Sequence, residues 1–445
     1  MSVQQHYQNI VVGSGPGGAA VARELARNGR SVLIVEYGPR FQKTGFLKTA
    51  KTAYLGRDKQ PLCSDGGVWI GRGRVLGGSS YLAMGNAVTP PAGILQEWGI
   101  DLSEEIAEAK TEMRVTLMPE QLIGPGTQAI NRGAAKLGWE MKPTPKCVDF
   151  SKCRNCGLCM FGCPTGAKWT TLEYIREAEE HGAGLLLNTE VLSVLHANGK
   201  ARGIVAEQNG REIQITGDRV ILSAGALATP LILQRSGLEK AGKGLANDVF
   251  QTTYGTTEHV GMQGEIILAT YLEKTIEERQ LFPAPYMYIP FLIQRDIQGG
   301  YPQNLNLLAQ AMMMLKSKGI DAKRTIAMMT KIRDERTGEV RSDGTVHKVL
   351  TAKDKAKLEE AYQINRDILI ASGAKPETIF PGVYESGHPC CSAAIGEVVD
   401  DNQQTEIRGL YVSDASVFPS PLGMPPILTI VALSKRLAKH LVDRS

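Results

Sequence analysis

Residues 9–36 read NIVVGSGPGGAAVARELARNGRSVLIVE. The apolar run at residues 9–12 is typical of a strand buried in a parallel sheet, and residues 31–35 predict a second such strand. Between them, residues 19–27 carry good helix formers, and the pair Asn28-Gly29 is a natural helix stop. This order predicts a strand–helix–strand unit with the motif G-x-G-x-x-G at its first turn.

Three glycines of this motif stand where many α/β proteins bind nucleotide phosphates. Gly13 permits the tight turn, Gly15 lets the backbone approach a pyrophosphate, and Gly18 lets helix and strand pack closely. The free N–H groups at the N-terminus of the helix favour a phosphate as well. Glu36 ends the second strand, where its carboxylate is expected to accept hydrogen bonds from ribose hydroxyls. The motif therefore predicts a bound dinucleotide and leaves NAD and FAD as alternatives.

The composition is ordinary for a globular protein, with 42% hydrophobic and 22% charged residues, and the 445 residues suffice for two or three domains. The formal net charge of +4 is too small to favour nucleic acid as a partner. No apolar run approaches the ~20 residues that a membrane helix needs, and residues 427–433 predict a buried helix. Because the first predicted strand lies so close to residue 1, we expect no signal peptide and a cytoplasmic location.

Four of the eight cysteines lie within eleven residues, at Cys153, Cys156, Cys159 and Cys163. Such clustering in a cytoplasmic chain indicates metal or redox chemistry rather than disulfides. The spacing C-x2-C-x2-C-x3-C-P is that of bacterial ferredoxins, so we predict that these thiolates hold one [4Fe–4S] cluster. Zinc and a metal-free loop are the alternatives. In two-cluster ferredoxins the cysteine before the proline binds the other cluster, which makes Cys147 an alternative fourth ligand.

Four later segments carry a family resemblance. Residues 72–90 read RGRVLGGSSYLAMGNAVTP, and residues 219–238 read RVILSAGALATPLILQRSGL. Residues 384–400 read YESGHPCCSAAIGEVVD, and residues 410–437 read LYVSDASVFPSPLGMPPILTIVALSKRL. Together these segments resemble the signatures of the glucose-methanol-choline (GMC) oxidoreductases. The resemblance implies that the dinucleotide is FAD. Some members that oxidise long-chain alcohols and sterols also have a similar cysteine-rich loop ending in Gly-x-Lys.

The resemblance assigns roles to single residues. Val191 would hold the adenine through its backbone, and Asp414 falls on the acid that bonds the ribityl chain or the phosphate. His388 falls on the active-site histidine of the family. The helix from Ile427 would point its N-terminus at the flavin C2 oxygen. The expected FAD contacts beyond the first motif are Gly77, Gly78, Ser79, Val191, Gly225, Asp414 and Pro426.

The resemblance also implies the architecture, which is an α/β fold. We expect a doubly wound, Rossmann-like FAD-binding domain and a smaller, sheet-based α+β substrate domain. The FAD-binding domain would be discontinuous and comprise residues 1–92, 171–245 and 384–445. Residues 93–170 would form a cysteine-rich iron–sulfur insertion, and residues 246–383 the substrate domain.

The stretch from residue 240 to residue 380 lies outside the resemblance. Tyr286, Tyr288 and Phe291 stand among β-formers and would suit a wall over a substrate. Residues 312–315 and the pair Met328-Met329 make a methionine-rich patch. Ordinary core is the favoured explanation for both sets.

Five positions depart from the family pattern. Pro425 stands where the family has its second catalytic residue, Asn or His, so a side-chain donor is missing there. Cys390 and Cys391 replace a Gly-Thr pair, and we favour a packing role for both thiols. Ala83 stands where the family usually has Asn, and Glu239 where it prefers Gly.

The sequence therefore predicts an FAD-dependent dehydrogenase acting on CH–OH donors of a small-molecule substrate. His388 would remove the hydroxyl proton while hydride passes to flavin N5. Electrons would then leave through the [4Fe–4S] cluster to a ferredoxin, a quinone or a partner subunit. One alternative is a flavin and iron–sulfur reductase, or an electron-transfer component, acting on C=O or C=C bonds. Another is a metal-stabilised binding protein with a vestigial flavin site.

Overall fold

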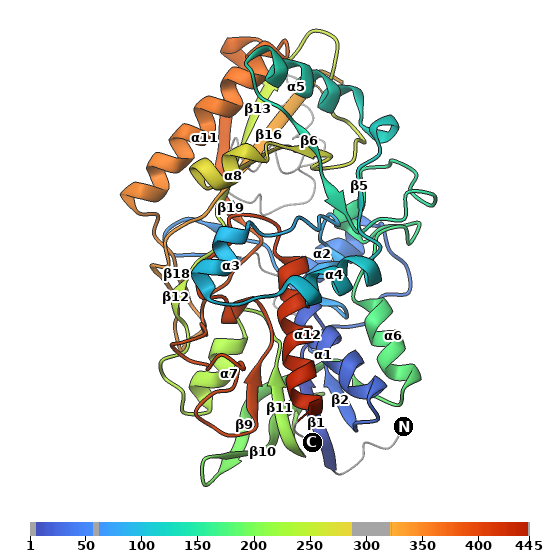
Figure 1. Cartoon of the computed structure of the whole chain (residues 1–445), viewed down its shortest axis with the longest axis vertical. Coiled ribbons are helices and arrows are strands. Elements are labelled where there is room, and N and C mark those ends of the chain that lie inside the picture. Colours follow the sequence, from blue (N-terminus) through green and yellow to red (C-terminus); the bar gives the residue numbers. More distant parts are fainter. Residues whose placement is uncertain (1–5, 57–61, 287–320, 322, 444–445) are drawn as a thin grey trace.

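A computed structural model describes residues 6–56, 62–286, 321 and 323–443. Two sheets, one in each half of an elongated molecule, organise the chain (Figure 1). The first strand, β1 (His6–Val12), and the last helix, α12 (Ile427–Asp443), both lie in the half that contains the predicted nucleotide motif. Among the described residues, no helix combines the length and the apolar character that crossing a bilayer requires.

The first sheet is built on the predicted strand–helix–strand unit. Strand β1 (His6–Val12) pairs in parallel with β2 (Val32–Val35) on one side and β11 (Arg211–Leu222) on the other. Strands β8 (Gly184–Leu186) and β20 (Leu410–Val412) extend the parallel part. All four residues of β2 are buried, as expected for a strand covered on both faces. The seven strands run in the order β8-β2-β1-β11-β10-β9, with β20 beside β11.

The other edge of this sheet is antiparallel. Strand β9 (Thr189–Ala197) pairs with β10 (Lys200–Gln208), which forms a hairpin with β11. The hairpin turns at Asn209 and Gly210, which have φ of 53° and 73°. Both residues tolerate the left-handed backbone that a two-residue turn needs. An Asn-Gly pair is typical of such a turn.

Four helices pack together against the parallel strands. Helix α1 (Pro16–Arg27) contacts α6 (Leu172–Glu180) and α12 (Ile427–Asp443), and α12 contacts α4 (Ser103–Glu112). Helix α1 begins three residues earlier than predicted, because Pro16 suits the first turn of a helix. The buried Arg23 joins three of the helices through ion pairs with Glu112 at 2.8 Å and Glu177 at 2.5 Å.

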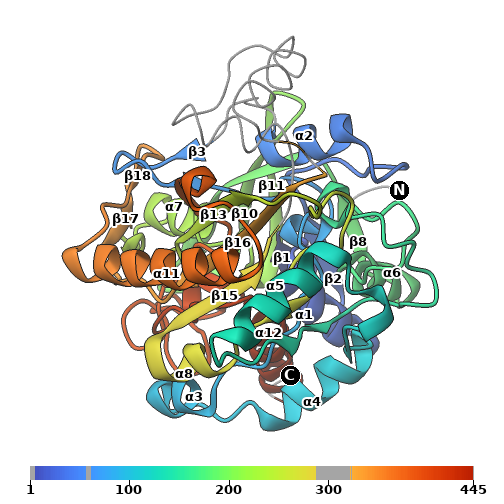
Figure 2. The same cartoon turned by 90° about the horizontal axis from the view of Figure 1, so that it is seen from above.

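The second sheet is mainly antiparallel and has six strands. It runs in the order β15 (Leu281–Pro285), β16 (Thr325–Ile332), β13 (Phe250–Thr256), β19 (Phe380–Ser386), β4 (Trp69–Ile70) and β3 (Leu62–Cys63). Helix α11 (Ala352–Ala371) covers one face and lies beside α5 (Pro125–Lys136), as Figure 2 shows from above. Thr351 caps α11 through a capping box with Asp354.

Segments cross between the predicted domains. Strands β3 and β4 come from the segment assigned to FAD binding, yet they complete the second sheet. The predicted insertion is likewise divided, since α4 packs on α12 of the first half and α5 packs on α11 of the second. In the same insertion, β6 (Lys142–Pro143) pairs with β14 (Thr270–Tyr271). The two halves are thus tied by the chain at several places.

The remaining helices and strands lie outside the two large sheets. They are α2 (Leu47–Leu55), α3 (Ala92–Trp98), β5 (Thr116–Leu117), β7 (Pro145–Lys146), α7 (Thr229–Arg235), β12 (Lys243–Leu245), α8 (Lys274–Arg279), β17 (Gly338–Val340) and β18 (Val346–His347). Strands β12, β17 and β18 form a small three-stranded sheet.

Candidate active site

The glycines of the first loop divide into two kinds. A Cβ atom added at Gly13, Gly17 or Gly18 would overlap backbone carbonyl oxygens of neighbouring segments. Gly13 also has a φ of +99°, which L residues rarely adopt. A Cβ at Gly15 would meet no heavy atom within 4 Å. Gly15 therefore faces open space at the N-terminus of α1, which is what a closely approaching pyrophosphate requires.

The second glycine loop lies directly against the first. The N–H of Gly77 donates to the Ser14 hydroxyl at 2.9 Å, and a Cβ on Gly78 would come within 2.8 Å of the Gly15 Cα atom. Ser79 accepts a hydrogen bond from the N–H of Gly73 at 3.0 Å. The two loops thus form one backbone surface, as the predicted FAD contacts require.

Glu36 lies beneath these loops and is buried. One carboxylate oxygen accepts both the N–H and the hydroxyl of Ser14, at 3.0 Å and 2.5 Å, and the other accepts the N–H of Gly38 at 2.6 Å. Burial raises the pKa of Glu36, and the hydrogen bonds from Ser14 and Gly38 oppose this rise. Glu36 therefore fixes the first loop whatever else it binds.

Asp414 joins the end of β20 to a third glycine turn. Its carboxylate accepts hydrogen bonds from the N–H of Gly225 at 2.9 Å, the Thr229 hydroxyl at 2.6 Å and the N–H of Ser416 at 2.8 Å. Burial raises the pKa of Asp414, and the bonds from Ser416 and Thr229 oppose the rise. A Cβ at Gly225 would meet nothing within 4 Å, so this turn also faces open space.

Two further predicted contacts lie at the margins of this surface. Val191 is a buried residue of β9 and pairs with Ala206 of β10. Pro426 directly precedes α12, and its carbonyl accepts the N–H of Ile430 at 2.9 Å. The first turn of α12 carries no acidic residue, so its positive end is not compensated by a carboxylate of that turn. The glycine surfaces and this helix end fit a bound FAD.

His388 follows β19 and lies where the second sheet meets the segment that leads into α12. Its Nδ1 atom is 3.7 Å from Oδ2 of Asp248, and both atoms are buried without a hydrogen-bond partner in the described structure. The other carboxylate oxygen of Asp248 accepts the N–H of Gly423 at 2.7 Å. Burial lowers the pKa of His388 well below its usual value, the Lys331 charge lowers it further, and a hydrogen bond with the Met424 backbone opposes both. The imidazole is therefore neutral near pH 7.

The motif search missed two residues of this site, Asp248 and Lys331. Burial and the neighbouring Asp334 raise the pKa of Asp248. Burial lowers the pKa of Lys331, and the nearby carboxylates of Asp248 and Glu385 oppose this fall. A sequence signal for Lys331 does exist, because it is a single charge in the otherwise uncharged strand TIAMMTKI, whose eight residues are all buried. Asp248 offered no such signal.

The neighbouring positions agree with the packing expectations. Cys390 and Cys391 are buried, with their Sγ atoms 3.5 Å apart. Tyr286 is buried and packs edge-on against Phe250, with ring centroids 5.8 Å apart. Tyr288, Phe291 and residues 312–315 lie outside the described residues.

The four predicted cluster ligands are free thiols on one loop. Cys156 is exposed, and Cys153, Cys159 and Cys163 are partly buried. Among the described residues, no three His, Cys, Asp or Glu side chains are arranged to hold a metal ion. Cys147 is buried in the main core, and its thiol donates to the Gly85 carbonyl at 3.3 Å. The thiol of Cys147 is thus enclosed by core packing. The four free thiols of the loop are the remaining candidate ligands for a cluster.

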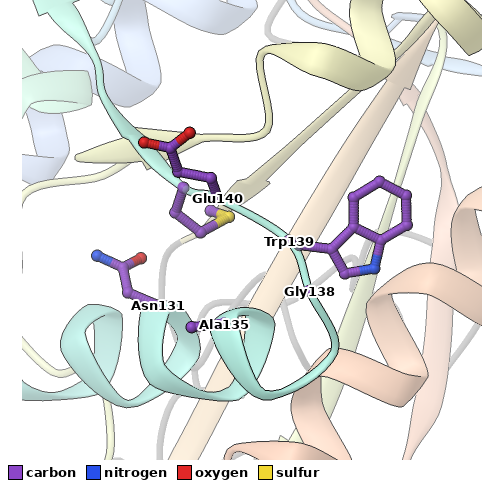
Figure 3. A pocket seen from close by; sticks show the side chains of 6 residues that line it. Asn131, Ala135, Gly138, Trp139 and Glu140 are labelled. Atoms are coloured by element: carbon purple, nitrogen blue, oxygen red, sulfur yellow. The ribbon is translucent and has the colours of Figure 1, made fainter.

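Two surface hollows are separate from the glycine loops and His388. One, of about 600 Å³, is lined by Cys153, Cys156 and neighbours on the cysteine loop. The other, of about 430 Å³, lies where α5 leads into β6 and is lined by Asn131, Trp139 and Glu140 among others (Figure 3). Neither hollow contains His388 or a predicted FAD contact.

Comparison of the sequence with protein-family models agrees with the glycine loops and the position of His388. The N-terminal family model described as GMC oxidoreductase matches residues 7–261, and its C-terminal counterpart matches residues 334–434. The chain belongs to the GMC oxidoreductase family. It is therefore an FAD-dependent enzyme of the class acting on CH–OH donors, as the sequence resemblance predicted.

Relatives and solved structures are similar to the chain over nearly all of its length. An uncharacterised protein of Methanocaldococcus jannaschii is 28% identical over 98% of this chain and 100% of its own length. A long-chain-alcohol oxidase of Arabidopsis thaliana is 24% identical over 97% of this chain and 68% of its own length. Pyridoxine 4-oxidase from "Mesorbium loti" has the same fold, with a TM-score of 0.69 at 14% identity over 98% of this chain and 99% of that structure. Formate oxidase from Aspergillus oryzae gives a TM-score of 0.68 at 13% identity over 100% and 99%. These likenesses confirm the predicted fold class.

Proposed function

We propose that this chain oxidises a hydroxyl group of a small organic substrate, with His388 as the general base. The observation that carries the proposal is the environment of His388. Burial and the nearby Lys331 keep its imidazole neutral near pH 7, which is the protonation state that a base needs. A hydrogen bond with Met424 sets it beside the Pro425-Pro426 segment that precedes α12.

Each predicted FAD contact has a part in this proposal. Gly13, Gly15 and Gly18 shape the pyrophosphate loop over Glu36, and Gly77, Gly78 and Ser79 add the second backbone surface. Val191 would hold the adenine, and Asp414 fixes the turn at Gly225. Pro426 directly precedes the helix whose N-terminus favours negative charge. When bound, FAD supplies an acceptor for the hydride that leaves the substrate carbon.

The substrate class follows from chemistry and from the relatives together. His388 needs a hydroxyl within hydrogen-bond reach, so the reacting group is an alcohol carbon. The named relatives include an oxidase for long-chain alcohols, and a structural neighbour oxidises pyridoxine. We take primary alcohols on an apolar or aromatic carbon skeleton as the first class to test, since these two proteins are named for a long-chain alcohol and for pyridoxine.

The test is anaerobic reduction of the bound flavin by alcohols alone. The panel is 1-octanol, benzyl alcohol, pyridoxine and glycolate, each mixed with the flavin-loaded protein without added reductant. Bleaching of the flavin absorbance by at least one alcohol supports the proposal. A flavin that is bleached only by reduced electron carriers supports the alternative, an electron-transfer or reductase component acting on C=O or C=C bonds.

A second proposal concerns the cysteine loop. We propose that Cys153, Cys156, Cys159 and Cys163 hold one [4Fe–4S] cluster, on the basis of their spacing and their free thiols. When bound, such a cluster supplies one-electron transfer to an external acceptor such as a ferredoxin or a quinone. The cytoplasmic location and the identity of that acceptor stay predictions.

Metal and sulfide analysis after anaerobic purification tests this second proposal. About four iron and four sulfide per chain are expected, with loss of both in Cys159→Ser. Cys147→Ser is the matched control and should keep the cluster, because its thiol is bonded to Gly85. Stoichiometric zinc without iron, or no metal at all, refutes the cluster.

A further inference from the structure

Three neighbouring strands of the second sheet place a row of side chains on one face. Phe250 of β13 is paired with Lys331 of β16 on one side and with Glu385 of β19 on the other. Directly paired residues of antiparallel strands project on the same face. The preceding residue, Thr330, bonds Asn365 of α11 at 3.0 Å, so Lys331 projects from the face away from α11. Glu385, which shares that face, lies three residues before His388.

The ammonium of Lys331 lies over an aromatic ring rather than over an acid. Its Nζ atom is 4.1 Å from the centroid of the Phe250 ring, and the residue is 5% exposed. Asp248 and Glu385 are near enough to favour its charge, but within the described structure neither forms an ion pair with it. A cation–π contact stabilises a buried charge without using the N–H donors in conventional hydrogen bonds.

The other buried lysines of the described chain are held differently. Lys348 pairs with Asp334 at 2.6 Å, and Lys435 pairs with three glutamates. Lys146 and Lys168 each donate to backbone carbonyls. Within the described residues, Lys331 is thus the buried lysine whose N–H donors have no oxygen acceptor. The Lys331 Nζ atom is not among the fully enclosed side-chain atoms that lack a partner, so its N–H donors are accessible to a ligand that can accept them.

Lys331 could also supply a hydrogen-bond donor that the site otherwise lacks. Pro425 has no side-chain donor, so the substrate oxygen lacks the second contact that the family resemblance leads one to expect. Lys331 is close enough to His388 for its charge to disfavour an imidazolium. The groups around the imidazole are Lys331 and Asp248, with Asp334, Arg333 and Glu385 behind them.

We propose that Lys331 is a second catalytic residue, whose ammonium donates a hydrogen bond to the substrate hydroxyl oxygen while His388 takes the proton. The inference rests on the proposed function. In the step, the O–H bond breaks and its proton goes to His388, and the C–H bond breaks with its electron pair going as hydride to FAD. A C=O bond forms on the substrate. Lys331 keeps its protons and stabilises the negative charge that develops on oxygen, where a preorganised donor has its largest effect.

The test compares Lys331→Met and Lys331→Gln with the wild type in anaerobic single-turnover reduction of the flavin. The substrate is the alcohol of the panel above that bleaches the wild type fastest. At saturating alcohol, we expect Lys331→Met to lower the limiting rate about 10²–10³-fold. Lys331→Gln retains an N–H donor and should recover part of that loss. In both variants the acid limb of the rate should move to higher pH, because the positive charge beside His388 is gone.

Controls separate this inference from the proposed function. Lys353→Met removes an exposed lysine of the same half, 80% exposed in its side chain, and should leave the limiting rate unchanged. Flavin absorbance and the melting temperature show whether each variant is loaded and folded.

If no alcohol bleaches the wild type, the proposed function itself fails. If the wild type is bleached and Lys331→Met matches its limiting rate, or changes only the alcohol affinity, the role of Lys331 is refuted. Should Lys331→Met lose its flavin, the rate and acid limb of Lys331→Gln decide in the same way.

Discussion

The two sheets present their sites in different ways. The first sheet offers backbone: the loops at Gly15, Gly78 and Gly225 approach one another or face open space, and Glu36 and Asp414 hold them in place. The second sheet offers side chains, because Lys331 reaches the His388 site from a strand that precedes it by more than fifty residues. A site made of backbone needs glycines at fixed spacing, whereas a site made of side chains needs only the correct strand register. A backbone site can therefore be predicted from the sequence, whereas a side-chain site of this type cannot.

The sharpest way to break this contrast is a pair of valine substitutions in the first loop. Gly17→Val places a Cβ on the Ser413 carbonyl oxygen, so we expect the chain not to fold, a loss of more than about 4 kcal/mol. Gly15→Val places its side chain in open space at a φ of −64°, which any L residue adopts. It should fold normally and bind no flavin. Circular dichroism and flavin absorbance measure the two effects.

Equal behaviour of the two variants would contradict the division of the loop. A Gly15→Val protein that keeps its full flavin content would show that Gly15 does not line the pyrophosphate site. A folded Gly17→Val protein would show that α1 and the end of β20 do not pack as closely as described.

A second prediction tests how strongly the half with the second sheet depends on buried side-chain charges. Lys348 and Asp334 form a fully buried ion pair at 2.6 Å, and Asp334 also accepts the N–H of Asn247, next to Asp248. Lys348→Met leaves a buried carboxylate without its partner and should lower the free energy of unfolding by about 3–5 kcal/mol. The exposed pair of Arg366 and Asp367 is the control, and Arg366→Met should cost less than about 1 kcal/mol. Denaturant titration compares them, and equal losses would contradict the burial of the Lys348 pair.

The smallest expected effect is a pH dependence that originates at His388. Its pKa in the folded protein lies well below the value of ~6.5 in the unfolded chain. As pH falls below ~6.5, the unfolded chain takes up a proton that the folded protein does not, so the free energy of unfolding decreases until the folded pKa is reached. His388→Gln should lose less stability than the wild type over this window. Denaturant titrations at pH 7 and pH 5 measure the difference, and identical pH dependence would contradict a His388 imidazole that stays neutral in the folded protein.

The sequence sufficed for much of the fold. The buried strand β2 and the helix α1 are set by local pattern, and the structure has them as predicted within a few residues. The glycine loops were identified by spacing, and the structure brings Gly78 against Gly15 as a shared FAD surface requires. The expected FAD-dependent class is confirmed by family membership. The individual site residues stay predictions.

The rest depended on contacts between distant segments. Strand β4 joins the second sheet by pairing with β19, and β3 pairs with β4. No local sequence pattern predicts either pairing. Lys331 belongs to the His388 site only because β16 and β19 flank β13 in a particular register. The buried Cys147 could not be separated from the other cysteines by spacing alone, whereas its bond to Gly85 separates it in the structure.

The central claim is that His388 takes the hydroxyl proton during oxidation of an alcohol. Anaerobic single-turnover reduction of the flavin by the most reactive alcohol, in the wild type and in His388→Ala with equal flavin content, tests it directly. The account predicts that the variant's flavin is reduced about 10²–10⁴ times more slowly. Reduction of the His388→Ala flavin at the wild-type rate would contradict it.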